Sequence, residues 1–410
     1  MRAANFSKSI NFMFLALSAA LIYAVSNGIR VNLSLLLDPI TYKTGVSYAQ
    51  LSFILAIGQF VYGLSQPLFG FMALKYSYKE VLLAGCALLA IGLIGTAYSS
   101  SFIGICFFLG FCFYASTGAL CFGIVLSCVS PLMTPYHAIV FSGILNTAAG
   151  VGSSFFSPAF SILLTNFDVS SALLILTTPL LLLVPISLVI GKLNSNVVIK
   201  DTHEKLPIKG VFRQAFLDKS YQIMLISFFI CGFHMGIIFT HLYPEFIASG
   251  LSAQSATLAY TLLGIAIAIG AFLCGIACVK YKYANILGSL YFMRALIVAS
   301  YVFFMPKNEI SAVIFAFLLG LTCDATVAPT SLIVNARFGA SKLAVLFGLV
   351  YIAHQLGCFV SAALGGILVS LFDSYEIIWV IDISLCLLAS TLCFNIKLPS
   401  SVKPHSLATV

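Results

Sequence analysis

Charge is what this sequence lacks. Charged residues make up 8% of the 410 residues, against about a quarter in soluble proteins. Hydrophobic residues make up 61%, and the mean hydropathy is +1.10. Twenty Lys and Arg with twelve Asp and Glu cannot cover a water-soluble globule of this length. These proportions exclude a soluble enzyme, a nucleic-acid-binding domain and a disordered chain.

Motifs for catalysis and for metal or cofactor binding are also missing. The chain has no GxxxxGK[ST] nucleotide loop, no HExxH, no nucleophile elbow and no CxxCH. All twelve cysteines lie in apolar stretches without a CxxC pair, and Cys274 and Cys278, one helical turn apart, have no further ligands nearby in sequence. We therefore expect no enzymatic activity, no cofactor and no metal, and we interpret the cysteines as packing residues.

Long apolar runs are what the sequence does contain. A bilayer core about 30 Å thick requires about 20 apolar residues of helix, and continuous runs without strict alternation exclude a barrel. The runs predict an all-α membrane protein with twelve transmembrane helices. The expected spans are 12–37, 48–73, 80–98, 101–128, 137–164, 170–191, 221–246, 254–279, 284–304, 310–335, 342–370 and 376–396.

One long polar stretch, 192–220, divides the chain at its midpoint. We predict an N-terminal six-helix bundle over 1–191, a cytoplasmic linker over 192–220 and a C-terminal six-helix bundle with a short cytoplasmic tail over 221–410. With both termini cytoplasmic, sixteen Lys and Arg lie on the inner side, and Lys43 and Lys307 alone lie outside. The positive-inside rule thus predicts a multi-pass protein of the inner (plasma) membrane with this orientation.

The two halves resemble each other at an offset near 205 residues. The matching positions are Gly28 with Gly232, Gly70-Lys75-Tyr76 with Gly275-Lys280-Tyr281, Gly143 and Gly152 together with Gly348 and Gly357, and Gly110-Tyr114 with Gly320-Asp324. Four matches in register predict two pseudo-symmetric six-helix bundles. Parallel repeats of this kind place a substrate site between the halves, near the midplane.

These features resemble the major facilitator superfamily of secondary transporters. The segment Gly70-Phe-Met-Ala-Leu-Lys-Tyr-Ser-Tyr-Lys79 is similar to the family signature Gly-x-x-x-Asp-Arg-x-Gly-Arg that follows the second span. The glycine and the basic residues match, but Leu74 replaces the acid and Ser77 the second glycine. The resemblance implies the superfamily fold and alternating access, with a small-molecule substrate, in a protein that is usually a monomer.

A narrower resemblance connects the chain with bacterial permeases grouped with monocarboxylate and oxalate–formate transporters. The runs that carry it are Gln66-Pro67-Leu68-Phe69-Gly70, Gly232-Phe233-His234 with Thr240-His241, Leu290-Tyr291-Phe292-Met293-Arg294-Ala295-Leu296, and His354-Gln355-Leu356-Gly357. The resemblance implies transport of a small organic anion, often with a proton. Better-known carriers of this group hold the carboxylate with an arginine in the eighth span, but 254–279 contains no charge.

Ionisable residues inside the spans are costly, so each is a candidate for function. Arg30 in span 1 is expected to bind a substrate carboxylate, with snorkelling or pairing to Asp38 as the alternative. Asp324 in span 10 occupies the position equivalent to Tyr114, and is a candidate for proton coupling or substrate binding. The alternative for Asp324 is a permanent pair with Arg294 of span 9, whose own role we expect to be structural, in an ion pair or with helix-end carbonyls.

Histidine and amide side chains complete the candidate site. His234 and His241 are seven residues apart on one face of span 7, and His234 is a candidate for proton coupling as well as for substrate binding. Helix packing or substrate contact would explain His354 and Gln355 in span 11. Gln59, Tyr62 and Gln66 share one face of span 2, as cavity lining or as packing. Asp382 and Glu245 are expected to be structural.

Together these observations predict a secondary active transporter of a small organic anion, most simply a monocarboxylate, moved either alone or with protons. We expect it to act as a monomer in the lipid bilayer. An exporter of amphipathic drugs or metabolites with the same fold is the first alternative. A membrane receptor or sensor that binds ligand without transport is the second. No nucleic-acid partner is expected.

Overall fold

The computed structural model describes residues 12–195 and 208–397. The predicted tail beyond Lys397 and the linker residues 196–207 lie outside these ranges. Twelve helices in the described residues are long and apolar enough to cross a membrane, which confirms the predicted number. They are Phe12–Val31, Tyr48–Ala73, Tyr78–Tyr98, Phe102–Leu132, Val140–Asn166, Val169–Asn194, Lys219–Thr240, Ala253–Lys280, Tyr283–Phe303, Glu309–Phe338, Val345–Phe372 and Glu376–Phe394.

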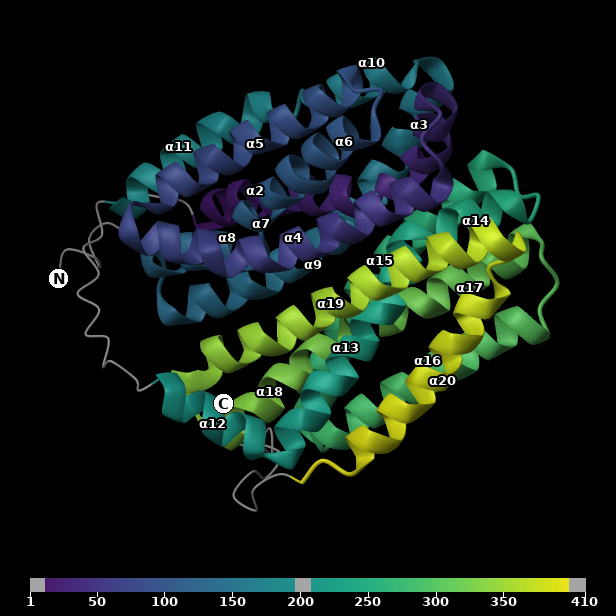
Figure 1. Cartoon of the computed structure of the whole chain (residues 1–410). Helices are drawn as coiled ribbons and strands as arrows, with labels where there is room; N and C mark the ends of the chain where they lie inside the picture. Colours follow the sequence, from purple (N-terminus) through teal and green to yellow (C-terminus); the bar gives the residue numbers. More distant parts are fainter. Residues whose placement is uncertain (1–11, 196–207, 398–410) are drawn as a thin grey trace. The chain divides into compact units, whose positions relative to one another are not determined.

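Contacts divide the chain into two compact units between Lys200 and Asp201. The N-terminal unit contains the helices α2 (Phe12–Val31), η1 (Leu33–Leu36), α3 (Leu37–Thr44), α4 (Tyr48–Lys75), α5 (Tyr78–Tyr98), α6 (Phe102–Ile105), the π-helix η2 (Cys106–Phe113), α7 (Tyr114–Ala119), α8 (Phe122–Val129), η3 (Ser130–Leu132), α9 (Pro135–Asn166), α10 (Val169–Ile175) and α11 (Leu180–Ser195) (Figure 1).

All secondary-structure elements in the described residues of the C-terminal unit are likewise helices. Its elements are α12 (Ile208–Leu217), α13 (Lys219–Thr240), α14 (Leu242–Ala248), α15 (Ala253–Lys280), α16 (Tyr283–Phe303), α17 (Glu309–Thr322), η4 (Asp324–Thr326), α18 (Val327–Phe338), α19 (Ala340–Phe372) and α20 (Glu376–Phe394) (Figure 1). The short helix α12 lies within the segment that the sequence predicts as a linker.

Side-chain caps mark where most spans begin. The first turn of a helix has backbone N–H groups without helical partners, and short polar side chains satisfy them. The capping residues Ser47, Ser77, Ser101, Thr134, Asp168, Asp218, Ser252 and Asn308 each accept from a backbone N–H of the following turn. The exposed carboxylate of Asp168 also accepts from the Ser171 hydroxyl, and these donors lower the pKa of Asp168.

The internal repeat appears as the same helix crossing in each unit. In the N-terminal unit α2 packs on α9, where a Cβ on Gly152 would lie 2.1 Å from the carbonyl oxygen of Ala24. In the C-terminal unit α13 packs on α19, where a Cβ on Gly357 would lie 2.0 Å from the carbonyl oxygen of Phe229. Each crossing therefore requires glycine, because backbone meets backbone there.

Spans 4 and 10 are interrupted, although the sequence predicts them as continuous. Span 4 changes from the π-helix η2 to the α-helix α7 at Tyr114, and its helix is interrupted after Ala119. Span 10 breaks at Cys323, directly before Asp324. Without water, the freed carbonyls need protein donors, and the Ser26 hydroxyl donates to the carbonyl oxygen of Leu120 over 3.2 Å.

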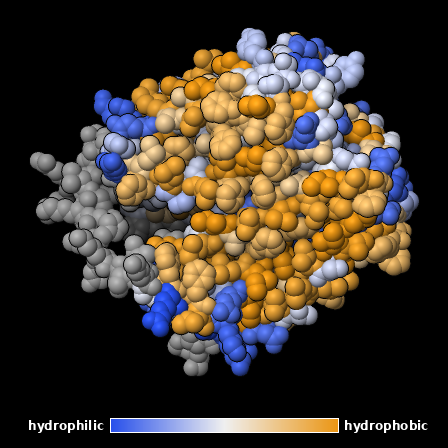
Figure 2. All heavy atoms as spheres, in the orientation of Figure 1, coloured by the Kyte–Doolittle hydropathy of each residue, from blue (hydrophilic) through white to orange (hydrophobic). Residues whose placement is uncertain are grey.

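Hydrophobic side chains are exposed along the helix flanks of both units. They include Phe14, Phe155, Leu181, Phe272 and Leu371, each more than half exposed. Figure 2 shows hydrophobic residues over the helix flanks on the face in view, with hydrophilic residues gathered at the helix ends. Such a surface is suited to lipid rather than to water.

Candidate functional site

Arg30 lies in the last turn of α2, and its side chain is 7% exposed. Its Nη1 donates to Oε1 of Gln59 over 3.1 Å, and its Nη2 donates to Oδ1 of Asn27 over 2.8 Å. The guanidinium carbon lies 4.3 Å from the centroid of the Tyr62 ring, at cation–π distance. These neutral side chains fix the orientation of the guanidinium.

Tyr114 belongs to the same cluster through Gly58. A Cβ on Gly58 would lie 2.1 Å from Cδ2 of Tyr114, so the ring packs directly on the α4 backbone beside Gln59. The N-terminal unit therefore brings together four residues that the sequence singled out: Arg30, Gln59, Tyr62 and Tyr114. All four are nearly fully buried. They come from α2, α4 and α7, and we call them the Arg30 cluster.

Sequence reasoning missed two members of this environment. Asn27 precedes Arg30 by three residues, so the shared helix face could have been recognised from spacing. Gly58 gave no signal, because its importance comes from a ring on another helix. Gln66, assigned to the face of Gln59 and Tyr62, is half-buried, and its Nε2 has no hydrogen-bond partner among the described residues.

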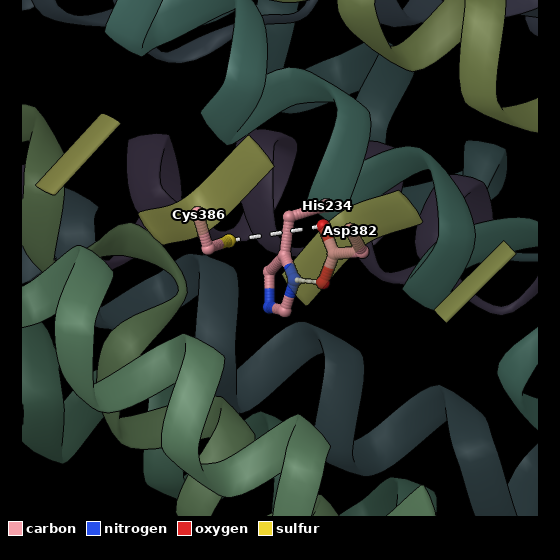
Figure 3. A group of neighbouring side chains, drawn as sticks. All are labelled: His234, Asp382 and Cys386. Atoms are coloured by element: carbon pink, nitrogen blue, oxygen red, sulfur yellow. Dashed lines mark hydrogen bonds and ion pairs between the residues drawn. The ribbon is translucent and has the colours of Figure 1, made fainter. Parts of the chain in front are cut away.

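His234 lies in the core of the C-terminal unit, where it contacts Asp382 of α20. The atoms Nδ1 of His234 and Oδ2 of Asp382 are 2.7 Å apart, and both side chains are fully buried (Figure 3). The thiol of Cys386, one turn further along α20, lies 3.8 Å from Oδ1 of Asp382. One potential metal-ligating atom from each of these residues lies within 4.8 Å of the others.

Arg294 is fully buried and satisfies the helix end at the break in span 10. Its Nη2 donates to the carbonyl oxygens of Thr322 and Cys323, the latter over 2.6 Å, and its Nη1 donates to Sγ of Cys231 over 3.2 Å. Within the described residues these contacts are hydrogen bonds, two of them to helix-end carbonyls, one of the two kinds of structural partner expected from the sequence. A cation at a helix C-terminus also matches the helix dipole.

The other predicted residues of this unit lie in separate surroundings. His241 is fully buried, and its Nε2 lies 3.0 Å from the carbonyl oxygen of Ala362, which ties α13 to α19. His354 stacks on Tyr351 with 5.5 Å between ring centroids. Its neighbour Gln355 is 2% exposed. Asp324 is half-buried and begins η4 at the break in span 10.

Known proteins resemble this chain in sequence and in architecture. The family model of the Major Facilitator Superfamily matches residues 15–314. Human monocarboxylate transporter 12 is 24% identical over 383 residues, covering 82% of this chain and 70% of that protein. The crystal structure of a bacterial homologue of the human lysosomal transporter Spinster, inward-facing and unoccupied, matches with a TM-score of 0.72 at 15% identity, covering 93% of this chain and 96% of that one.

The family match spans well over half of the chain, and the solved structure has the fold that the twelve spans and two repeats predict. Members of this family are transporters rather than enzymes. The chain is a multi-pass membrane transporter of the Major Facilitator Superfamily.

Proposed function

We propose that this transporter moves a small organic anion, a monocarboxylate, and that Arg30 binds its carboxylate. The observation that carries the proposal is the Arg30 cluster, in which a nearly buried guanidinium is oriented by the neutral side chains of Gln59 and Asn27. An arginine within a span is costly and is a functional candidate by default. The likeness to monocarboxylate transporter 12 supports a carboxylate as cargo.

The geometry gives Arg30 a reason to prefer an anion. Gln59 and Asn27 accept from the guanidinium as neutral groups. A carboxylate carries the full negative charge that these amides lack, and it can accept two parallel hydrogen bonds from a guanidinium. Tyr62 then covers one face of the guanidinium, and Tyr114 closes the cluster from α7.

Substrate transport is proposed to occur together with a proton. Asp324 at the break in span 10 and His234 in the core of the C-terminal unit are the coupling candidates, with His241, His354 and Gln355 as further substrate contacts. The protein would work as a monomer in the inner (plasma) membrane with both termini in the cytoplasm, the linker 192–220 included. The distribution of Lys and Arg supports this orientation.

Uptake into proteoliposomes tests the proposal. L-[14C]lactate is the probe, with a panel of amino acids, sugars and cationic amphipaths as competitors. We expect uptake of lactate that other monocarboxylates inhibit, and loss of this uptake in Arg30→Gln. Lys43→Gln, which removes an exposed cation from α3 after span 1, serves as the matched control and should transport normally.

Three outcomes would contradict the proposal. Full carboxylate uptake by Arg30→Gln would remove Arg30 from the site. Transport of cationic amphipaths alone would indicate an exporter. Stabilisation of the purified protein by a carboxylate, without flux in any direction, would indicate a receptor or sensor, because a ligand that binds the native state raises its stability even when it is not moved.

A further inference from the structure

The contact between His234 and Asp382 has two chemical features that a packing contact does not require. The first is its burial: both side chains are 0% exposed, although the two residues lie 148 positions apart in the sequence. The second is the other ring nitrogen: Nε2 of His234 is buried and has no hydrogen-bond partner among the described residues. A buried polar atom left unsatisfied destabilises the folded protein, so an unsatisfied atom in a membrane protein requires an explanation.

The carboxylate determines the tautomer of the ring. An ionised Asp382 can only accept, so Nδ1 of His234, 2.7 Å away, must donate. The neutral ring then presents Nε2 as an unprotonated acceptor. A neighbouring carboxylate of this kind orients an imidazole and stabilises its protonated form, as in other carboxylate–histidine pairs.

Titratable and charged groups surround the pair from each helix packed against it. On α20, Cys386 contacts Asp382, and on α13, Cys231 precedes His234 by three residues and contacts Arg294 of α16. Helix α16 packs against α20, so Arg294 belongs to the same core. Arg294 and Asp382 are both fully buried.

Two further elements, α19 and the break in span 10, also carry titratable groups in this unit. On α19, His354 and Cys358 lie beside α13, where a Cβ on Gly232 would meet the backbone of His354. At the break in span 10, the carbonyl oxygen of Cys323 accepts a hydrogen bond from Arg294, and Asp324 follows Cys323 in the sequence.

We propose that His234 and Asp382 form a protonation site, in which Nε2 of His234 takes up the proton that accompanies the substrate and Asp382 holds the ring with Nε2 open. The proposal rests on the proposed proton-coupled anion transport and adds Asp382 of span 12 to it. The proton enters from solution and leaves to solution, with no bond to carbon made or broken.

Electrostatics explains why such a site would couple proton and anion. With Nε2 unprotonated, an ionised Asp382 and Arg294 contribute one negative and one positive charge to the buried residues of this unit. A proton on Nε2 adds one positive charge to a core of low dielectric, where an uncompensated charge is expensive. A bound anion reduces that cost, and by linkage the proton favours the anion by the same factor. The full burial of the pair also prevents the proton from exchanging freely with water.

A metal ion is the competing occupant, since His234, Asp382 and Cys386 could each offer one ligand atom. The spacing of 2.7 Å between Nδ1 and Oδ2 is that of a hydrogen bond with a proton between the two atoms. We therefore assign the pair to a proton. Zinc bound at one ion per chain in the purified protein, measured by mass spectrometry, and lost in Cys386→Ser, would overturn this assignment.

Transport in proteoliposomes separates coupling from binding. One proton per lactate lets a gradient of one pH unit drive about tenfold accumulation. We expect Asp382→Asn and His234→Gln to lose this accumulation while still exchanging L-[14C]lactate at equal pH on both sides, because exchange requires no net movement of protons. In His234→Gln the amide can still donate to Asp382, which guards against simple misfolding. Glu376→Gln, the same loss of charge at the exposed start of α20, should accumulate normally.

Accumulation at the wild-type level in either variant would overturn the proposal, and so would equal loss of exchange and accumulation in a variant that melts normally. Failure of the proposed function looks different: the wild-type protein itself would then neither exchange nor accumulate lactate.

A second measurement needs no substrate. Trp379 is the single tryptophan, and its ring centroid lies 6.4 Å from that of His234. A protonated imidazole quenches indole fluorescence at short range, so lowering the pH should quench Trp379 in one transition. The transition should disappear in His234→Gln and persist in Glu245→Gln, which removes the other titratable partner of Trp379. A transition that survives in His234→Gln, or none in the wild-type protein, would contradict the proposed site.

Discussion

Arg294 of α16 donates from Nη2 to the carbonyl oxygen of Cys323 over 2.6 Å, and so closes the broken end of α17 in the middle of span 10. The guanidinium is fully buried, and the bilayer core contains no water that could replace it as a donor. The interruption beside Asp324 therefore depends on a cation contributed by a neighbouring helix.

Arg294→Met should destabilise the protein strongly. It leaves the carbonyl oxygens of Thr322 and Cys323 without this donor, at about 1–3 kcal/mol for each unsatisfied buried group. The melting temperature of the purified protein, followed by the fluorescence of Trp379, measures the effect. Lys282→Met, a similar change at the exposed start of α16, should have little effect. An unchanged melting temperature in Arg294→Met would show that the helix end has another donor.

Gly232→Ala should disrupt the crossing of α13 and α19. The new Cβ would lie 1.8 Å from the carbonyl oxygen of His354, and overpacking of a close contact costs about 1–3 kcal/mol. Gly348→Ala on α19 is the matched control, because no atom lies within 4 Å of its new Cβ. That control should be neutral or stabilising by up to about 1 kcal/mol from helix propensity. Equal melting temperatures in the two variants would contradict the close packing at Gly232.

Arg30→Lys should weaken substrate binding while the charge is retained. Lysine cannot donate in the planar fork that places Arg30 between Gln59 and Asn27. Loss of one charge-assisted hydrogen bond, worth about 1.5–3 kcal/mol, corresponds to an increase in KM of about ten- to a hundredfold. Lactate uptake at graded concentrations gives KM, with Lys43→Arg as the control. If KM stays at the wild-type value, positive charge alone is sufficient at this position.

The orientation in the membrane is open to a direct test. A green fluorescent protein fused after Lys282 should fluoresce, because the segment between spans 8 and 9 is expected in the cytoplasm. Alkaline phosphatase fused after Lys307 should be active, because the segment between spans 9 and 10 is expected outside. The reverse pattern of signals would mean that both termini lie outside the cytoplasm.

Hydropathy and charge were sufficient for the architecture. Twenty apolar residues of helix span a bilayer whatever their neighbours are, so the twelve spans could be predicted without any tertiary contact. The glycines were also informative, because Gly28 and Gly232, with Gly152 and Gly357, repeat at nearly the same offset and lie at the same crossing in each unit. A close helix crossing leaves no room for a side chain, and so it can be recognised in the sequence as a repeated glycine.

Polar partners required the tertiary structure. Helical spacing places Gln59 and Tyr62 on one face and His234 and His241 on another, but it does not tell which helix that face meets. Only packing decided that Arg30 contacts Gln59, that His234 contacts Asp382 rather than His241, and that Arg294 binds the carbonyls at the break in span 10. The breaks in spans 4 and 10 were not predictable for the same reason, because the groups that satisfy the freed backbone come from other helices, far away in the sequence.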